Sequence, residues 1–322
     1  PWDHNFFMKG KIRIGHAEDL KGKTGCTVFI FEEGAVASAD IRGGASSTRQ
    51  FDSLSPFHIG ERINAILFAG GSAFGLNSAQ GVMQFLEEEN KGMRYSAALI
   101  PVVPTAIIFD LFFGDYNARP TPEMAYTACK NSKFVDEISQ GSAGAGCGAT
   151  IGKVLTVKNA TKGGFGMAYD LEKPSIIACV VLNCFGDVLD ETGKIIAGAR
   201  KNPESFEFLN TEKFLEENGL PFLQGSQENS TLSILITDGK LTKKECFLVA
   251  QMISSALSSC ISPFNTPVDG DITICVSCGN EKYDVFSTGM KGRRLIKSAV
   301  WNAVKNADGF GILPSFRDIF KK

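Results

Sequence analysis

The sequence predicts a single-domain, layered α/β sandwich. Its β-patterned runs cluster in blocks, with long amphipathic helical segments between the blocks rather than after every strand, which favours a sandwich over strict βαβ alternation. Hydrophobic residues make up 43% of the chain and charged residues 21%, an ordinary globular composition. The 322 residues could form one large or two ordinary domains. Because we find no repeat and no low-complexity segment, one domain spanning residues 1–322 is the simplest interpretation.

The first part of the chain predicts short strands followed by two helices. Three β-patterned runs cover residues 11–14, 25–31 and 35–41 and are separated by glycine and charged residues. Apolar residues then recur near the 3.6-residue period over 72–89, which predicts a helix. A second helix is expected over 121–131, with proline in its first turn.

The middle of the chain predicts two strands and then a surface segment. Residues 151–157 and 176–184 read as strands, and the second is apolar enough to be buried on both faces. Residues 193–228 are rich in glycine, proline and charge, with one expected helix over 212–217. This predicts a surface excursion, where cleavage of the chain is sterically possible.

The final part predicts two further strand and helix pairs. A strand over 231–237 precedes a helix over 242–258, and a strand over 272–278 precedes a helix over 293–305. The sandwich would therefore end in alternating strands and helices.

Charge and hydropathy exclude several classes of function. The net charge of −2 gives no indication of nucleic acid or of an anionic membrane surface as a partner. The most apolar run, residues 97–113, contains Pro101, Pro104 and Asp110, so it is too short and too interrupted to span a bilayer. Residues 1–4 lack the basic and apolar pattern of a secretory signal. We therefore expect a cytoplasmic protein.

The cysteine pattern agrees with that location. Nine cysteines are scattered without a repeated spacing, which is typical of reduced, buried thiols. Cys275 and Cys278 form a lone CxxC in a strand-like run, where the two thiols would face opposite sides of a sheet. Such motifs often occur by chance, and we expect no metal.

The glycine-rich segments are weak nucleotide motifs. Residues 144–149 match a GxGxxA pattern, but no buried strand precedes them and a strand rather than a helix follows. Residues 148–154 are too short between their glycines for a phosphate loop. Tight turns and close backbone approach explain these glycines better, so no cofactor is expected.

The junction between Asn229 and Ser230 admits two interpretations. A polar loop over 225–229 runs directly into the apolar strand, with the serine at the boundary. The strand could simply begin with Ser-Thr. Alternatively, Ser230 attacks the carbonyl of Asn229 and emerges as an N-terminal nucleophile. The histidines are dispersed, so a Ser-His-Asp site has no obvious base, whereas a freed α-amine with a pKa of about 7.7–8.0 is suited to proton transfer.

Four other polar residues are candidates for the same site. Asn183 lies in an apolar strand. Its side chain is either a structural amide whose hydrogen bonds are satisfied or an oxyanion donor. Lys153 begins an apolar run, where a buried lysine needs a partner or a lowered pKa. Asp269 and Asp271 flank one glycine. They either form an ordinary turn or place two carboxylates on the same face of the strand.

Several segments in order together resemble the self-processing L-aminopeptidase/D-esterase family, which includes β-peptidyl aminopeptidases and nylon-oligomer hydrolases. The resemblance covers nearly the whole chain and rests on residues 15–17, 24–28, 40–45, 70–76, 144–153, 183–187 and 269–271.

The resemblance implies an αββα sandwich, shared with ornithine acetyltransferase and similar to N-terminal-nucleophile hydrolases. It implies cleavage between Asn229 and Ser230, giving chains 1–229 and 230–322 that stay associated and assemble into a homo-oligomer, a tetramer or larger. Ser230 matches the nucleophile and Asn183 the oxyanion-stabilising asparagine. Lys153 matches a site lysine of the nylon-oligomer hydrolases. Asp269 and Asp271 match the acidic pair that supports the nucleophile there.

Two residues depart from the family pattern, and the substrate stays open. Relatives often carry tyrosine where this chain has Phe74 and Phe109, which removes a hydrogen-bond donor at each position. Small peptides, amino-acid amides and esters, β-peptides and oligoamides are all candidate substrates. The alternatives are an uncleaved small-molecule binding protein of the same fold and an acyltransferase that passes the acyl group to an amine.

Overall fold

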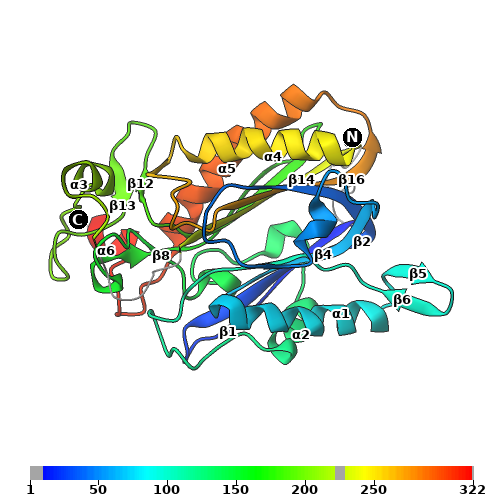
Figure 1. The fold of residues 1–322 in the computed structure, drawn as a ribbon, viewed down its shortest axis with the longest axis horizontal. Coiled ribbons are helices and arrows are strands. Elements are labelled where there is room, and N and C mark those ends of the chain that lie inside the picture. The colour runs from blue at the N-terminus through cyan, green and yellow to red at the C-terminus, as the bar shows by residue number, and fades with distance from the viewer. Residues whose placement is uncertain (1–9, 222–228, 321–322) are drawn as a thin grey trace.

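Helix, sheet, sheet and helix layers build the structure, a computed structural model that describes residues 10–221 and 229–320 (Figure 1). Helices α4 (Lys243–Leu257) and α5 (Val285–Asn306) cover one sheet layer. Helices α1 (Ala79–Glu88) and α2 (Pro122–Lys130) cover the other. The predicted αββα sandwich is confirmed. Residues 1–4, for which the sequence predicted no secretory signal, lie outside the described ranges.

The main strands form one hydrogen-bonded path that curves through both sheet layers. Their order is β10-β11-β14-β16-β2-β4-β7-β3, with β1 also paired to β2. Their bounds are β1 Ile12–Asp19, β2 Thr24–Ile41, β3 Thr48–Arg49, β4 Arg62–Ala69, β7 Thr105–Ile107, β10 Gly164–Asp170, β11 Ile176–Asn183, β14 Ser230–Gly239 and β16 Ile272–Glu281. The smaller elements are β5 Met93–Tyr95, β6 Ala98–Ile100, β8 Thr150–Ile151, β9 Thr161–Lys162, β12 Asp187–Leu189, β13 Ile195–Ala197, β15 Ile261–Ser262, α3 Thr211–Asn218 and α6 Phe316–Phe320.

Strand β2 belongs to both layers. Its residues 36–41 pair with β16, whereas residues 24–31 pair with β1. Its register against β4 shifts between Ile30 and Ala35, and Gly34 there adopts a φ of 70°. A β-bulge of this kind bends a strand, and a positive φ suits glycine. The sequence predicted two strands here, and the structure shows one bent strand.

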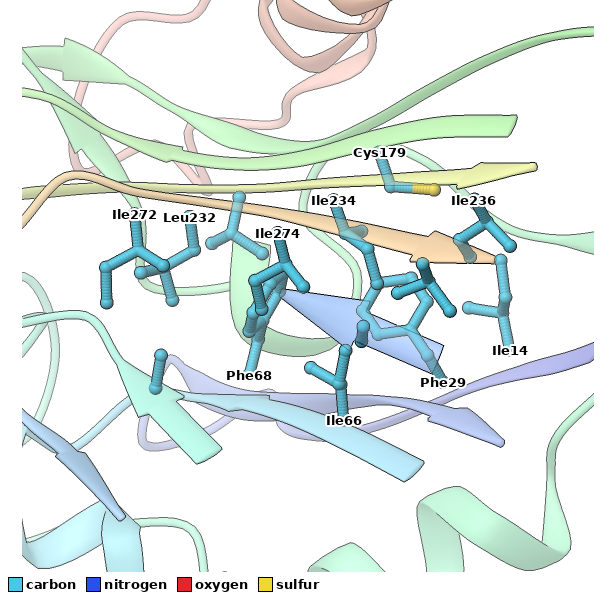
Figure 2. Close-up of a cluster of buried hydrophobic side chains, with 14 of the residues drawn as sticks. Ile14, Phe29, Ile66, Phe68, Cys179, Leu232, Ile234, Ile236, Ile272 and Ile274 are labelled. Carbon is cyan, nitrogen blue, oxygen red and sulfur yellow. The ribbon is translucent and has the colours of Figure 1, made fainter. Parts of the chain in front are cut away.

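The largest apolar cluster fills the space between the two sheet layers (Figure 2). Leu232, Ile234 and Ile274 point down from one layer, while Phe29 and Phe68 point up from the other. Burying each such side chain contributes roughly 1.5–3 kcal/mol. Two further clusters lie under α4 and α5 and under α1 and α2. Strand β14 is buried along its whole length and forms part of this central packing.

Two sequence predictions about local structure were wrong. The run over 72–89 begins as a 3₁₀ segment, Ser72–Ser78, and becomes α-helical only at Ala79. The strand expected over 151–157 shrinks to β8, because the chain turns at Gly152 with a φ of 77°. A Cβ on Gly152 would lie 2.0 Å from the nitrogen of Ala199, so close backbone packing and not strand pairing shapes this segment.

The excursion predicted over 193–228 is only partly a surface feature. The helix expected over 212–217 is present as α3, but residues 196–200 are buried. The Arg200 guanidinium donates to the carbonyls of Lys158, Ala160 and Ser205, so that the charged group anchors this segment to the body. Strands β4 and β10 were not predicted from the sequence.

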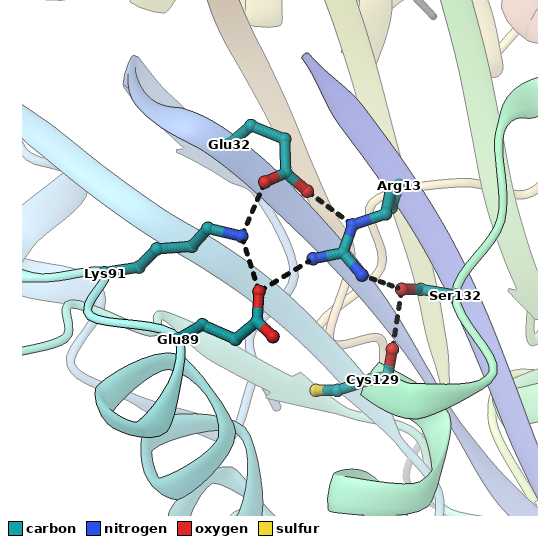
Figure 3. Close-up of polar contacts among 6 residues, drawn as sticks. All are labelled: Arg13, Glu32, Glu89, Lys91, Cys129 and Ser132. Atoms are coloured by element: carbon teal, nitrogen blue, oxygen red, sulfur yellow. Dashed lines mark hydrogen bonds and ion pairs between the residues drawn. The ribbon is translucent and has the colours of Figure 1, made fainter. Parts of the chain in front are cut away.

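A half-buried polar network joins the β1–β2 pair to the ends of α1 and α2 (Figure 3). Glu32 on β2 contacts both Arg13 on β1 and Lys91, the latter at 2.5 Å. Arg13 also donates to Ser132 Oγ at 3.1 Å, and Glu89 completes the ring through Lys91 at 3.1 Å. Burial alone would raise the pKa of the Glu32 carboxyl. Hydrogen bonds from Lys91 and Arg13 outweigh it and hold that pKa below its usual value.

Candidate active site

Ser230 is the first residue of β14, in the middle of the sheet path between β11 and β16. The antiparallel register places it opposite Asn183, the last residue of β11. Ser230 is only 2% exposed and Asn183 is fully buried. Two residues far apart in the sequence are therefore side by side at one end of the buried layer.

The backbone of Asn229 is held by the loop before β16. Asn229 forms an isolated parallel bridge with Asp269. Its N–H donates to the carbonyl of Val268 at 3.3 Å, and its own carbonyl accepts from the Gly270 N–H at 2.5 Å. Of the polar loop predicted over 225–229, only Asn229 falls within the described residues.

The Asn183 side chain makes hydrogen bonds through both its oxygen and its nitrogen. Its Oδ1 accepts from the Thr150 N–H at 3.0 Å and from Lys153 Nζ at 3.1 Å. Its Nδ2 donates to the carbonyl of Phe109 at 3.2 Å. The amide oxygen is thus satisfied in this structure, and one N–H of the NH₂ group is directed at the Phe109 carbonyl.

Lys153 is buried, 3% exposed, directly after the turn at Gly152. Besides Asn183 Oδ1, its Nζ donates to the carbonyls of Thr150 at 2.8 Å and Asn183 at 2.9 Å. Burial lowers the pKa of the ammonium to about 8, and this is opposed by the electrostatic influence of Cys184, Asp269 and Asp271. With all three of its donors used, Lys153 fixes the position of Asn183.

Asp269 and Asp271 are buried at 1% and 2% exposure and hold the loop against the start of β14. Asp271 accepts from the Thr231 N–H at 2.7 Å and from the Asn265 N–H at 3.1 Å. Burial, and then the charge of Asp269, raise the pKa of Asp271 to about 8. Burial likewise raises the pKa of Asp269, whose carboxylate accepts from Thr266. The Asp271 carboxyl thus contacts the start of β14 directly, whereas the Asp269 carboxyl holds the loop at Thr266.

Gly270 lies between these carboxyls and against the serine. A Cβ there would be 2.6 Å from Ser230 Oγ and 2.9 Å from the Ala45 carbonyl. The Ala45 N–H donates to the Asp269 carbonyl at 2.8 Å, and the Arg42 N–H to the Asp271 carbonyl at 3.0 Å. Glycine at 270 therefore allows this loop to approach the nucleophile candidate.

Of Phe74 and Phe109, the two residues where relatives often carry tyrosine, only Phe109 lies beside the candidate site. Phe109 adjoins the site through Asn183, and its ring meets Phe112 edge-on with centroids 5.0 Å apart. Phe109, Phe112 and Lys153 line a cavity of about 10 Å³, room for about one water molecule. Phe74, by contrast, is 56% exposed under the guanidinium of Arg119.

Sequence reasoning missed the residues that act through their backbone. Thr150 and Thr231 each present an N–H to a site side chain, and the Gly270 N–H contacts Asn229. Main-chain donors carry no residue-type signal. The glycine between the two aspartates is a signal that could have indicated a close approach at Gly270.

The glycine-rich and CxxC motifs have structural explanations. Gly144–Gly146 is a 3₁₀ turn followed by β8, as expected for tight turns. Cys275 packs beneath the helices and Cys278 against the inter-sheet core, which confirms their opposite faces. Within residues 10–221 and 229–320, no group of His, Cys, Asp or Glu side chains is arranged to hold a metal ion.

Comparison with known proteins places the chain in a family. The family model described as Peptidase family S58 matches residues 10–309. The chain belongs to peptidase family S58. An uncharacterized aminopeptidase of Mycobacterium tuberculosis is 30% identical over 346 residues, covering 97% of this chain and 96% of the relative. A 6-aminohexanoate-oligomer endohydrolase of a Kocuria species is 29% identical, covering 91% of this chain and 80% of the relative.

Solved structures share the fold of this S58 peptidase. A Burkholderia β-aminopeptidase superposes with a TM-score of 0.70 at 16% identity, covering 99% of this chain and 92% of that chain. The L-aminopeptidase D-Ala-esterase/amidase of Ochrobactrum anthropi, described as a variant of the Ntn hydrolase fold, gives 0.69 at 15%, covering 95% and 87%. These similarities show the fold.

Membership of the S58 family makes the protein a hydrolase of peptide or other amide bonds. The helices in the described ranges include none that is long and apolar enough to cross a bilayer.

Proposed function

We propose that this S58 peptidase is a self-cleaving aminopeptidase whose nucleophile is Ser230, released by cleavage of the Asn229–Ser230 bond. The observation that carries the proposal is the position of Ser230. It begins a buried central strand, opposite Asn183 and against the Asp-Gly-Asp loop of residues 269–271. The serine, the asparagine and the Asp-Gly-Asp loop therefore lie beside the Asn229–Ser230 bond.

Self-cleavage begins with attack by Ser230 Oγ on the carbonyl carbon of Asn229. The C–N bond breaks, the serine nitrogen takes up the proton, and an ester joins the two residues. Water then hydrolyses the ester, which leaves a carboxylate on Asn229 and a free hydroxyl and amine on Ser230. The products are chains 1–229 and 230–322.

The released amine then serves as the base for substrate hydrolysis. Its ordinary pKa of about 7.7–8.0 lets it accept the hydroxyl proton near neutrality. The Asn183 NH₂ group, now donating to the Phe109 carbonyl, turns to the oxyanion of the substrate. A donor of this kind typically contributes roughly 10²–10³-fold in rate. When the amine is protonated, its positive charge favours the ionised forms of the neighbouring Asp269 and Asp271 carboxyls, which in turn stabilise that charge.

The two products stay together because their strands interleave. Strands β14 and β16 of the small chain lie between β11 and β2 of the large chain. The small chain also contributes α4 and α5, which pack against each other. Helix α4 also packs against β2, and helix α5 against β10 and β11. Separation would expose the apolar clusters on both faces of this layer, which opposes dissociation.

We further infer small peptides, amino-acid amides or oligoamides as substrates, a cytoplasmic location and a homo-oligomer, a tetramer or larger. The relatives named above support the substrate class, and the nine free cysteines support a reducing compartment. Exposed apolar side chains beside the β5–β6 hairpin, Phe57, Ile59 and Tyr95, support self-association. Light scattering coupled to size exclusion measures the assembly, and cell fractionation the location.

Intact mass spectrometry tests the nucleophile. Wild type should give two fragments whose masses sum to the chain plus one water, and Ser230→Ala should give only the full chain. Ser233→Ala is the matched control, because Ser233 is buried in the same strand and bonds the Ile272 carbonyl at 3.2 Å. Wild type that stays whole after prolonged incubation contradicts the proposal.

Product analysis then tests the reaction. Mature enzyme incubated with a panel of amino-acid amides and 6-aminohexanoate oligomers should release free acid and amine. Adding an amine acceptor distinguishes hydrolysis from acyl transfer, since new amide as the main product would indicate an acyltransferase.

A further inference from the structure

We propose that the backbone N–H of Gly270 is the oxyanion donor for self-cleavage. This inference rests on the proposed function and adds a second donor to it. Gly270 would act on the Asn229–Ser230 bond of the chain itself, while Asn183 acts on substrates.

The geometry joins the donor to the carbonyl that would react. The Gly270 N–H lies 2.5 Å, nitrogen to oxygen, from the carbonyl oxygen of Asn229. When Ser230 Oγ attacks that carbonyl, negative charge develops on the same oxygen. A hydrogen bond to an oxyanion is stronger than one to a neutral carbonyl, so this contact stabilises the transition state more than the ground state. Asn229 is fully buried, which strengthens the effect by excluding water.

Asn183 is engaged elsewhere in the uncleaved chain. Its Nδ2 donates to the Phe109 carbonyl, and its Oδ1 accepts from Thr150 and Lys153. A donor to the Asn229 oxygen is already present in Gly270, so self-cleavage needs no rearrangement of the asparagine. Gly270 is therefore the donor to the Asn229 carbonyl in the uncleaved chain, and we assign Asn183 to the substrate reaction.

The loop holds the Gly270 N–H in place before the reaction. On one side Asp269 accepts from the Thr266 N–H at 3.1 Å, and on the other Asp271 accepts from the Thr231 N–H at 2.7 Å. The Ala45 N–H fixes the carbonyl of Asp269 at 2.8 Å. Donors that are positioned in advance require no reorganisation during the reaction, which is the basis of oxyanion stabilisation. The two aspartates thus act partly by orienting the glycine between them.

Replacing the N–H by an oxygen atom tests the proposal with little change of shape. Glycolic acid introduced at position 270 turns the amide into an ester, which removes the donor and weakens the Asp269 carbonyl as an acceptor for the Ala45 N–H. We expect self-cleavage, followed by intact mass, to slow by roughly 10²–10³-fold. Glycolic acid at Gly141 is the matched control, because that N–H donates to the Phe165 carbonyl at 2.7 Å in a buried backbone pair away from Ser230.

A second measurement needs no change at Gly270. In Ser230→Ala, which keeps the bond whole, labelled ¹⁵N at Gly270 and ¹³C at the Asn229 carbonyl should show a scalar coupling through the hydrogen bond. Absence of that coupling overturns the proposal. So does a glycolate variant that cleaves at the wild-type rate. Wild type that never cleaves refutes the proposed function as well, so the two failures are distinguishable.

Discussion

Lys153 Nζ donates to both the backbone carbonyl and the side-chain Oδ1 of Asn183, at 2.9 and 3.1 Å. The lysine and the asparagine are therefore one polar unit, although 30 positions separate them. The ammonium directs the asparagine oxygen inward, so that the NH₂ group is left pointing away from the lysine, toward the Phe109 carbonyl.

Replacing Lys153 should disturb the site. Lys153→Met leaves the carbonyls of Thr150 and Asn183 without this donor, at a cost of about 1–3 kcal/mol for each buried group left unsatisfied. We expect a lower unfolding midpoint in urea and slower hydrolysis. Lys158→Met in the same segment is the control, because Lys158 is exposed; equal effects of the two changes would contradict this role.

Asn183→Asp separates the structural contacts of the asparagine from its proposed role as an oxyanion donor. The variant keeps the oxygen that accepts from Thr150 and Lys153 but loses the donor. We expect hydrolysis of amino-acid amides to fall by roughly 10²–10³-fold, with a much smaller effect on folding. Asn159→Asp is the matched control for Asn183→Asp, because Asn159 is also buried and its side chain donates to the Arg200 carbonyl at 3.1 Å. A full rate with Asn183→Asp would show that the amide is only structural.

Stability should fall as pH rises through the range in which Asp271 ionises. The folded chain raises the pKa of Asp271 to about 8 through burial and the charge of Asp269, whereas an unfolded aspartate titrates near 3.9. The folded state then binds more protons between about pH 4 and 8, so the free energy of unfolding decreases with pH there. Asp271→Asn in the Ser230→Ala background should flatten the slope measured by urea unfolding at pH 6, 7 and 8. An unchanged slope would contradict the assignment.

The network around Glu32 has the opposite pH dependence. Hydrogen bonds from Lys91 and Arg13 outweigh burial and hold the pKa of Glu32 low, so its stabilisation is present above the unfolded pKa and lost as pH falls through the folded one. Glu32→Gln should cost about 1 kcal/mol at pH 7 after allowing for solvent screening, measured by urea unfolding, and less at pH 3. Glu207→Gln, in the exposed pair with Lys201, should have no measurable effect.

The sequence predicted those parts of the fold whose signal is local. The strand now seen as β14 and the helix α4 follow from apolar periodicity, and the structure adds a capping box of Thr242 with Glu245 at the start of α4. The bend in β2 and the shortness of β8 depend on backbone approaches at Gly34 and Gly152, which no periodicity encodes. Strand β4 was missed between two loops.

The candidate site shows the same division. Family resemblance identified Ser230, Asn183, Lys153 and the two aspartates, and the fold brings them together. Their hydrogen bonds could not be predicted, because many of the partners are main-chain groups of Thr150, Thr231 and Gly270. Main-chain positions become partners only when the tertiary structure exists.

Given the proposed cleavage, the insertion of β14 and β16 between β11 and β2 would also make refolding depend on whether the chain has been cut. In the uncut protein, those strands find their neighbours within one chain, and recovery from denaturant is a first-order process. In the cut protein two separate polypeptides would have to collide, so recovery would become second order and would fail in dilute solution. A cut at one peptide bond would thus convert a protein that can be renatured into one whose native state, once lost, is recovered only at high concentration.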